Sequence, residues 1–199
     1  MLKTLPLYLS AAALALAGCG QANDGNDAAP EQSGEANEAA GDQTIAASLN
    51  QNGRFFQAAK AVGLDATLAG PGPYTVLVPS DAAFGEVEGG ALNDPSNPQN
   101  RAEITRILTS HILPGVILAE DISKAIDAGG GKAVLATMGG ETLTATKDGD
   151  SIVLTDSAGG TATITQADQK LSNGVVHQVD GLLTPSREAQ AAAQTQPAG

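Results

Sequence analysis

The sequence predicts a single α+β domain in which several helices come first and a series of antiparallel strands follows. Apolar residues between 45 and 64 recur at helical spacing, whereas segments 141–147, 151–155, 161–165 and 175–179 have strand composition and are separated by turn residues. Because 42% of the 199 residues are hydrophobic, the chain has enough apolar material for a packed core. Helices followed by strands favour an α+β architecture over a βαβ repeat.

The N-terminus has the organisation of a secretory signal peptide over residues 1–18. Lys3 supplies a positive charge, and a mostly apolar run follows at residues 5–17. This run is too short to span a bilayer, which takes roughly 20 apolar residues, but it has the length of a signal-peptide core.

The apolar run ends at Leu16-Ala17-Gly18-Cys19, which resembles a bacterial lipobox, and Cys19 is the only cysteine in the chain. The resemblance implies that Cys19 is lipidated, becomes the new N-terminus and anchors the protein in a membrane. The next residue is Gly20 and not Asp, which by similarity to Gram-negative lipoproteins favours the outer membrane of the cell envelope, on its periplasmic or its exposed side. The alternative is an ordinary signal peptide with an incidental cysteine.

Residues 19–43 combine this cysteine with an acidic segment that is predicted to be a disordered tether. Positions 21 to 42 contain six acidic residues, no basic residue and no aliphatic side chain larger than alanine. Such a segment cannot bury enough apolar area to offset its ordering entropy; an acidic binding tail is the alternative. The Ala- and Gln-rich segment 188–199 is predicted to fray, which leaves 44–187 as the folded domain.

The elements of the domain follow one another in a definite order. The helical region 45–64 has Gly63 near its end, and a buried strand at 74–78 is ended by Pro79. Ser80 then caps a short helix that carries Phe84.

Two further helices are predicted over 101–112, with His111 on the apolar side, and over 118–128. The strands named above complete the domain, with turns at Asp148-Gly149 and at Asn173-Gly174, where glycine allows a positive φ.

Three segments together resemble the fasciclin domain family: 74–84 (YTVLVPSDAAF), 108–115 (LTSHILPG) and 172–185 (SNGVVHQVDGLLTP). Their order and separation fit the family, and the resemblance covers 44–187. It implies a compact wedge of antiparallel strands flanked by several short helices. It also implies non-catalytic adhesion, through contact with extracellular matrix or another surface partner. We expect no cofactor and no metal.

The candidate residues within these segments are mostly given structural roles. Ser80 and Asp81 suit the start of a helix, and Phe84 suits the core. We expect His111 to be buried, hydrogen-bonded and in contact with Ser80 or Asp81, and His177 to be structural or exposed. The candidates are Thr75, Pro79, Ser80, Asp81, Phe84, His111, Pro114, Gly115, Asn173, Gly174, His177 and Asp180.

Integrin-binding members of the family use an Asp-Ile pair after the Pro-Gly and a Tyr-His pair at the end of the helix. Asp121-Ile122 matches the first pair, but Ser110 precedes His111 where the second would have tyrosine. The tripeptide Asn52-Gly53-Arg54 also resembles a weak integrin-related signal. The alternative for Asp121 is a place on a solvated helix face.

Composition excludes several other classes of protein. A formal charge of −12 would repel nucleic acid, and one cysteine with two histidines cannot form a disulfide framework or a zinc–thiolate site. The Gly129–131 run lacks the spacing of a phosphate-binding loop, and Asp148-Gly149-Asp150 lacks the spacing of a calcium loop, because Ile152 occupies the fifth position.

The predicted partners are therefore the membrane, through Cys19, and an unidentified surface protein or polysaccharide. One alternative is a periplasmic module that binds a small molecule or polysaccharide, which requires a pocket near Asp81 and His111. The other is a hydrolase, which requires a nucleophile within hydrogen-bond reach of His111 or His177.

Overall fold

A computed structural model describes residues 41–86 and 90–184 of the chain. The signal peptide, Cys19, nearly all of the predicted tether and the 188–199 tail lie outside these residues. Within the two described ranges, no helix is long and apolar enough to cross a membrane.

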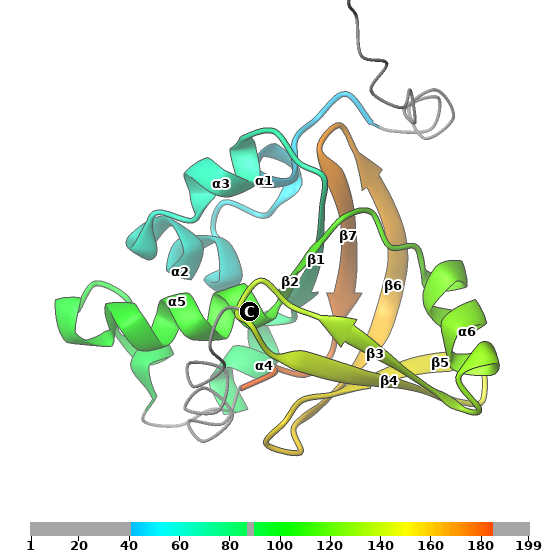
Figure 1. The fold of residues 1–199 in the computed structure, drawn as a ribbon. Helices are drawn as coiled ribbons and strands as arrows, with labels where there is room; N and C mark the ends of the chain where they lie inside the picture. The colour runs from blue at the N-terminus through cyan, green and yellow to red at the C-terminus, as the bar shows by residue number, and fades with distance from the viewer. Residues whose placement is uncertain (1–40, 87–89, 185–199) are drawn as a thin grey trace, which may run out of the picture. The chain divides into compact units, whose positions relative to one another are not determined.

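Seven strands form one sheet in the order β2-β1-β7-β6-β5-β4-β3 (Figure 1). β1 and β7 run parallel, and every other neighbouring pair runs antiparallel. The strands are β1 (Tyr74–Pro79), β2 (Ile112–Pro114), β3 (Lys132–Ala136), β4 (Thr142–Asp148), β5 (Ser151–Thr155), β6 (Thr161–Leu171) and β7 (Gly174–Val179). The helices are α1 (Ile45–Ser48), α2 (Arg54–Val62), α3 (Asp65–Ala69), α4 (Asp81–Glu86), α5 (Arg101–Ser110) and α6 (Ala119–Ala128), with 3₁₀ turns at Ala91–Asn93 and Pro98–Asn100.

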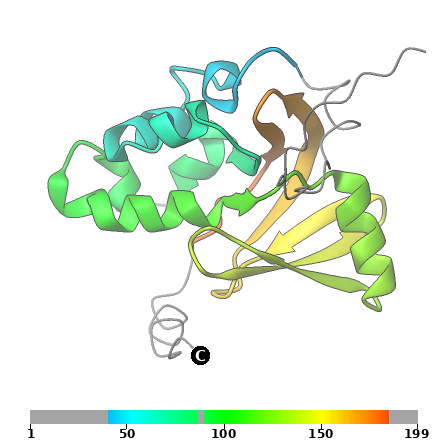
Figure 2. The same cartoon turned by 45° about the horizontal axis from the view of Figure 1, so that its top comes forward.

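Two clusters of buried apolar side chains meet at strand β1. Val76 and Val78 belong to the cluster shared with α1, α2, α3 and α5, whereas Leu77 belongs to the cluster shared with α6 and β3–β6. This follows from the geometry of a strand, in which successive side chains point to opposite faces. Figures 1 and 2 show the same division: α2, α3 and α5 gather beside β1, and α6 packs against β3, β4 and β5. The predicted α+β class is confirmed.

The predicted 101–112 helix ends earlier than expected, at Ser110. His111 caps it, with its backbone N–H bonded to the carbonyl of Leu108, and the next three residues form β2. β2 pairs antiparallel with β1, so that Ile112 lies opposite Val76. The apolar periodicity continued past the true end because Ile112 is buried by the sheet and not by the helix.

Two further features of the sheet were not predicted. The strand β3 follows the Gly129–131 run, and its alanine-rich sequence has weak strand propensity, although Ala133 and Leu135 alternate into the core. The hairpin series from β4 to β7 is antiparallel as expected, but β7 also pairs parallel with β1, about 100 residues away. No local turn signal can indicate such a distant pairing.

Candidate functional site

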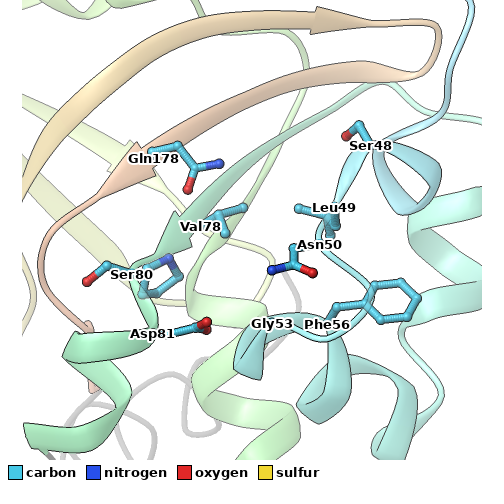
Figure 3. A pocket seen from close by; sticks show the side chains of 10 residues that line it. Ser48, Leu49, Asn50, Gly53, Phe56, Val78, Ser80, Asp81 and Gln178 are labelled. Atoms are coloured by element: carbon cyan, nitrogen blue, oxygen red, sulfur yellow. The ribbon is translucent and has the colours of Figure 1, made fainter.

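A depression lies where β1 ends and α4 begins (Figure 3), and we call it the β1 groove. Its volume is about 170 Å³. It is enclosed by the loop between α1 and α2, the end of β1, the first residue of α4 and one residue of β7. The lining residues are Ser48, Leu49, Asn50, Gly53, Phe56, Val78, Pro79, Ser80, Asp81 and Gln178.

Two polar residues of the segment 74–84, Ser80 and Asp81, build one wall of the β1 groove. Ser80 Oγ accepts a hydrogen bond from the backbone N–H of Ala83 at 3.3 Å, which is the predicted helix-capping contact. Asp81 Oδ1 accepts a bond from the backbone N–H of Arg54 at 2.8 Å, so it joins the start of α4 to the start of α2. Phe84, on the same short helix, is buried in the core as predicted.

His111 is fully buried, but it does not reach the β1 groove. Its Nε2 accepts a hydrogen bond from the backbone N–H of Leu183 at 3.1 Å, so Nδ1 carries the proton and donates to the carbonyl of Ile107 at 2.7 Å. The expected contact with Ser80 or Asp81 was therefore wrong, because both ring nitrogens are engaged elsewhere. Burial lowers the pKa of His111 to about 4, so the ring is neutral at pH 7.

His177, in strand β7, is also fully buried. Its Nδ1 accepts from the backbone N–H of Asp168 at 3.1 Å, and its Nε2 donates to the carbonyl of Ile117 at 2.9 Å. Asp168, a non-glycine residue with φ 60°, accepts from the backbone N–H of Ala119 through Oδ1 at 2.8 Å. His177 and Asp168 thus hold the start of α6 against β6 and β7.

These contacts bear directly on the hydrolase alternative. A nucleophilic hydroxyl must donate to a histidine nitrogen that is able to accept. The accepting nitrogen of His111 is occupied by Leu183, and that of His177 is occupied by Asp168. The geometry therefore gives the hydrolase reading no support.

Asn173, in the segment 172–185, joins the last strand of the domain to its first helices. Asn173 Oδ1 accepts from the backbone N–H of Ile45 at 2.8 Å, and its Nδ2 donates to the carbonyls of Leu68 and Gly70 at 2.9 and 2.8 Å. Asn173 is therefore more than a turn residue. Gly174 has φ 153°, and a Cβ at this position would overlap the carbonyl oxygen of Tyr74 on the parallel strand.

The remaining candidates near β2 also make internal contacts. Thr75 Oγ1 donates to the carbonyl of Gly115 at 2.8 Å and accepts from the N–H of Ile117 at 2.9 Å. Gly115 has φ 91°, and it follows the exposed Pro114. Near the C-terminal end of β7, Asp180 Oδ1 accepts from the N–H of Thr163 at 2.6 Å.

The Asp-Ile pair lies at the start of α6. Ile122 is only 2% exposed and packs in the core, whereas Asp121 is exposed and accepts from the N–H of Leu118 at 3.2 Å. The pair therefore cannot present both side chains to a partner. Ile122 is instead a core residue, and Asp121 beside it caps the start of the helix.

Two buried carboxylates, Asp156 and Glu141, were not predicted from the sequence. Asp156 is fully engaged: Oδ1 accepts from the N–H groups of Ala158 and Gly160, and Oδ2 accepts from Thr184. Glu141 Oε2 accepts from Ser157 at 3.2 Å, but Oε1 has no hydrogen-bond partner among the described residues. Burial raises the pKa of Glu141. Across the described ranges, no group of three or more potential ligands is placed to hold a metal ion.

Known proteins resemble the chain in both sequence and fold. The protein sll1483 of Synechocystis sp. is 32% identical over 142 residues, which cover 71% of each chain. The transforming growth factor-beta-induced protein ig-h3 of Sus scrofa is 33% identical over 132 residues, which cover 64% of this chain and 17% of that protein. A solved structure, that of a FAS1 domain pair from the insect cell adhesion molecule fasciclin I, has a TM-score of 0.53 and 24% identity.

The insect match covers 69% of this chain and 47% of the other, so this chain spans about half of that domain pair, and the likeness is one of fold. The family model of the fasciclin domain matches residues 50–185, well over half of the chain. The matched region begins in the loop beside the β1 groove and ends at the last residue of the segment 172–185. This chain therefore belongs to the fasciclin-domain family.

Proposed function

We propose that this protein is a non-catalytic adhesion module, held in the cell envelope by a lipid on Cys19, that contacts extracellular matrix or another surface partner. The observation that carries the proposal is the fasciclin-domain match over residues 50–185. One protein of similar fold is itself an insect cell adhesion molecule. The bonding of His111 and His177 supports a non-catalytic role, since both rings serve the packing of the domain.

The proposed location depends on the N-terminal sequence. A signal-peptide core followed by Leu16-Ala17-Gly18-Cys19 supports export and lipidation, and Gly20 favours the outer membrane. An acidic segment between the lipid and the domain suits a spacer, because like charges repel one another and extend the chain. The partner in this proposal is a surface protein or polysaccharide, and not nucleic acid.

Adhesion is tested by deleting the gene and measuring cell attachment and biofilm formation. We expect attachment to fall and to return when the wild-type gene is supplied. Exposure of the protein at the surface is checked in parallel by protease treatment of intact cells. Unchanged attachment of the deletion strain, with exposure confirmed in the parent strain, would contradict the proposal.

Anchoring is tested separately with Cys19→Ser. We expect this variant to leave the membrane fraction, because the lipid attachment atom is lost while the domain sequence is unchanged. Ser33→Ala, in the predicted tether, is the control and should stay with the membrane. Retention of Cys19→Ser in the membrane would refute the lipid as the anchor and leave adhesion to be judged from the deletion strain.

A further inference from the structure

We propose that the β1 groove is a binding site for a single neutral, polyhydroxylated ring such as a hexopyranose unit of a surface glycan. The inference names a ligand class for the surface interaction proposed above and rests on that proposal for its biological setting. It depends on three observations: polar atoms that the fold does not use, an apolar floor, and the absence of a cation among the lining residues.

The polar side chains line the same groove. Figure 3 shows Asn50, Asp81 and Gln178 grouped around Val78, with Gln178 on one side of it and Asn50 and Asp81 on the other. Asn50 uses its Oδ1 to accept from the N–H of Asn52 at 3.0 Å, and no described residue accepts from its side-chain N–H groups, which can therefore donate to a ligand. Asp81 Oδ1 accepts from the backbone N–H of Arg54, and no described residue donates to Oδ2, which can therefore accept from a ligand.

Gln178 is the least committed of these side chains. Its backbone carbonyl accepts from Thr165, but its side-chain amide makes no hydrogen bond within the described residues. It therefore offers both a donor and an acceptor. A half-buried amide without an internal task contrasts with Asn173, whose amide is used completely by the fold.

The floor is apolar and well packed. Leu49, Phe56 and Val78 are each less than 10% exposed, and Pro79 lies beside them. A sugar ring has hydroxyls around its edge and C–H groups on its faces, so it can pack on such a floor while its hydroxyls bond to the rim. Apolar surface with a few converging polar groups is the usual composition of a ligand site.

The charges of the groove favour a neutral ligand. Asp81 is the acidic side chain among the lining residues, and no lysine, arginine or histidine lines the groove. From residue 44 onward the chain has 16 acidic and nine basic residues, which gives a formal charge of −7. Phosphate, sulfate and uronate groups would therefore be repelled.

The topology argues against a peptide strand as the ligand. Peptides that add to a sheet need an unpaired edge, but β1 is bonded on both sides, to β2 and to β7. The volume of about 170 Å³ also lies below the 300–1,000 Å³ typical of sites for drug-sized ligands. One ring fits this size. Weak binding of single rings becomes strong when many copies on one surface meet a polymer.

The test is a titration of the ¹⁵N-labelled full-length chain, kept in a detergent without a sugar headgroup. The probes are the methyl glycosides of glucose, galactose and mannose, with glucuronate as the charged counterpart of the same ring. We expect at least one neutral glycoside to cause saturable shifts in the side-chain amide signals of Asn50 and Gln178. Glucuronate should bind about tenfold more weakly.

Two variants make the assignment specific. Gln178→Ala should weaken binding about fivefold, the usual value of one hydrogen bond, whereas Gln169→Ala on the adjacent strand should leave it unchanged. Asp81→Asn keeps an acceptor for the Arg54 N–H but removes the charge. It should therefore reduce the difference in binding affinity between the neutral glycoside and glucuronate.

Several results would overturn the inference. It fails if no neutral glycoside shifts these signals at concentrations up to about 100 mM, or if the shifts fall outside the groove. It also fails if Gln169→Ala and Gln178→Ala weaken binding equally. Ligand binding is measured in solution, whereas adhesion is measured on cells. A negative result in one experiment does not decide the other, so the two proposals can fail independently.

Discussion

Two regions of this domain use polar side chains in opposite ways. In the interior, both ring nitrogens of His111 and of His177 are hydrogen-bonded, and so is the side-chain amide of Asn173. In the β1 groove, Gln178 and Asn50 retain donors that no described residue accepts. Buried polar groups are costly when unpaired, so the interior set is committed to the fold. The groove set is available for a ligand.

The largest expected effect comes from the tightest point of the interior region. Gly174→Ala would place a Cβ against the carbonyl of Tyr74, between the parallel strands β1 and β7. We expect loss of about 4 kcal/mol or more, or failure to fold, measured by urea denaturation. Gly149→Ala is the control: it also replaces a glycine with positive φ but meets no atom within 4 Å, so it should cost only about 1 kcal/mol.

Asn173→Ala should have the next largest effect. It removes three hydrogen bonds and leaves the N–H of Ile45 and the carbonyls of Leu68 and Gly70 without that partner. We expect a loss of about 3 kcal/mol in the free energy of unfolding. Asn52→Ala, at an exposed loop position, is the matched control and should change stability by less than about 0.5 kcal/mol. Equal losses in the two variants would mean that Asn173 has no special structural role.

The interior region also predicts a pH dependence through His111. Its pKa is about 4 in the folded chain, below the ordinary value of 6.5, so between these values the unfolded chain binds more protons. The His111 contribution to stability is therefore complete above pH 6.5 and is lost as the pH falls toward 4. At about 1.4 kcal/mol per pH unit, the loss amounts to about 3 kcal/mol.

The measurement is the urea midpoint of the wild type and of His111→Gln from pH 7 to pH 4. Subtracting the two curves removes the contributions of the other acidic groups. The wild type should lose its advantage over the variant as the pH falls. Parallel curves would show that protonation of His111 does not affect stability.

Glu141 should give a smaller effect of the opposite sign. Its pKa is raised in the folded chain, chiefly by burial, so the folded state takes up a proton more readily than the unfolded state. Relative to Glu141→Gln, the wild type should gain stability as the pH falls toward 4.5. Its bond from Ser157 and the charge of Arg106 limit the shift. Urea midpoints across the same pH range, with Asp150→Asn as an exposed control, would reveal the difference.

The smallest effect on stability is expected in the groove. Gln178→Ala should change the free energy of unfolding by less than about 0.5 kcal/mol, since its amide supports no described contact. This variant separates the two regions: it should affect ligand binding alone, whereas Asn173→Ala should affect folding. A large loss of stability in Gln178→Ala would mean that the groove also belongs to the structural framework.

The capping role of Ser80, the core position of Phe84 and the burial of His111 could be read from neighbouring residues, because each depends on a few positions along the chain. The partners of the histidines could not. His111 meets Leu183, 72 residues away, and His177 meets Ile117, 60 residues away. Gln178, Asn50 and Asp81 line one groove although they come from three separate parts of the chain. Their proximity could therefore not be predicted from neighbouring residues either.

Local patterns alone determined the α+β class, most of the strands and the family resemblance, because hydrophobic periodicity and turn residues act over short distances. Tertiary structure decided the parallel pairing of β1 with β7, the extra strands β2 and β3 and which polar residues remain available. These features arise when elements far apart in the chain compete for the same backbone groups and the same buried space. Whether a polar residue serves the fold or a ligand is then set by what packs against it, and the residue type by itself carries no such information.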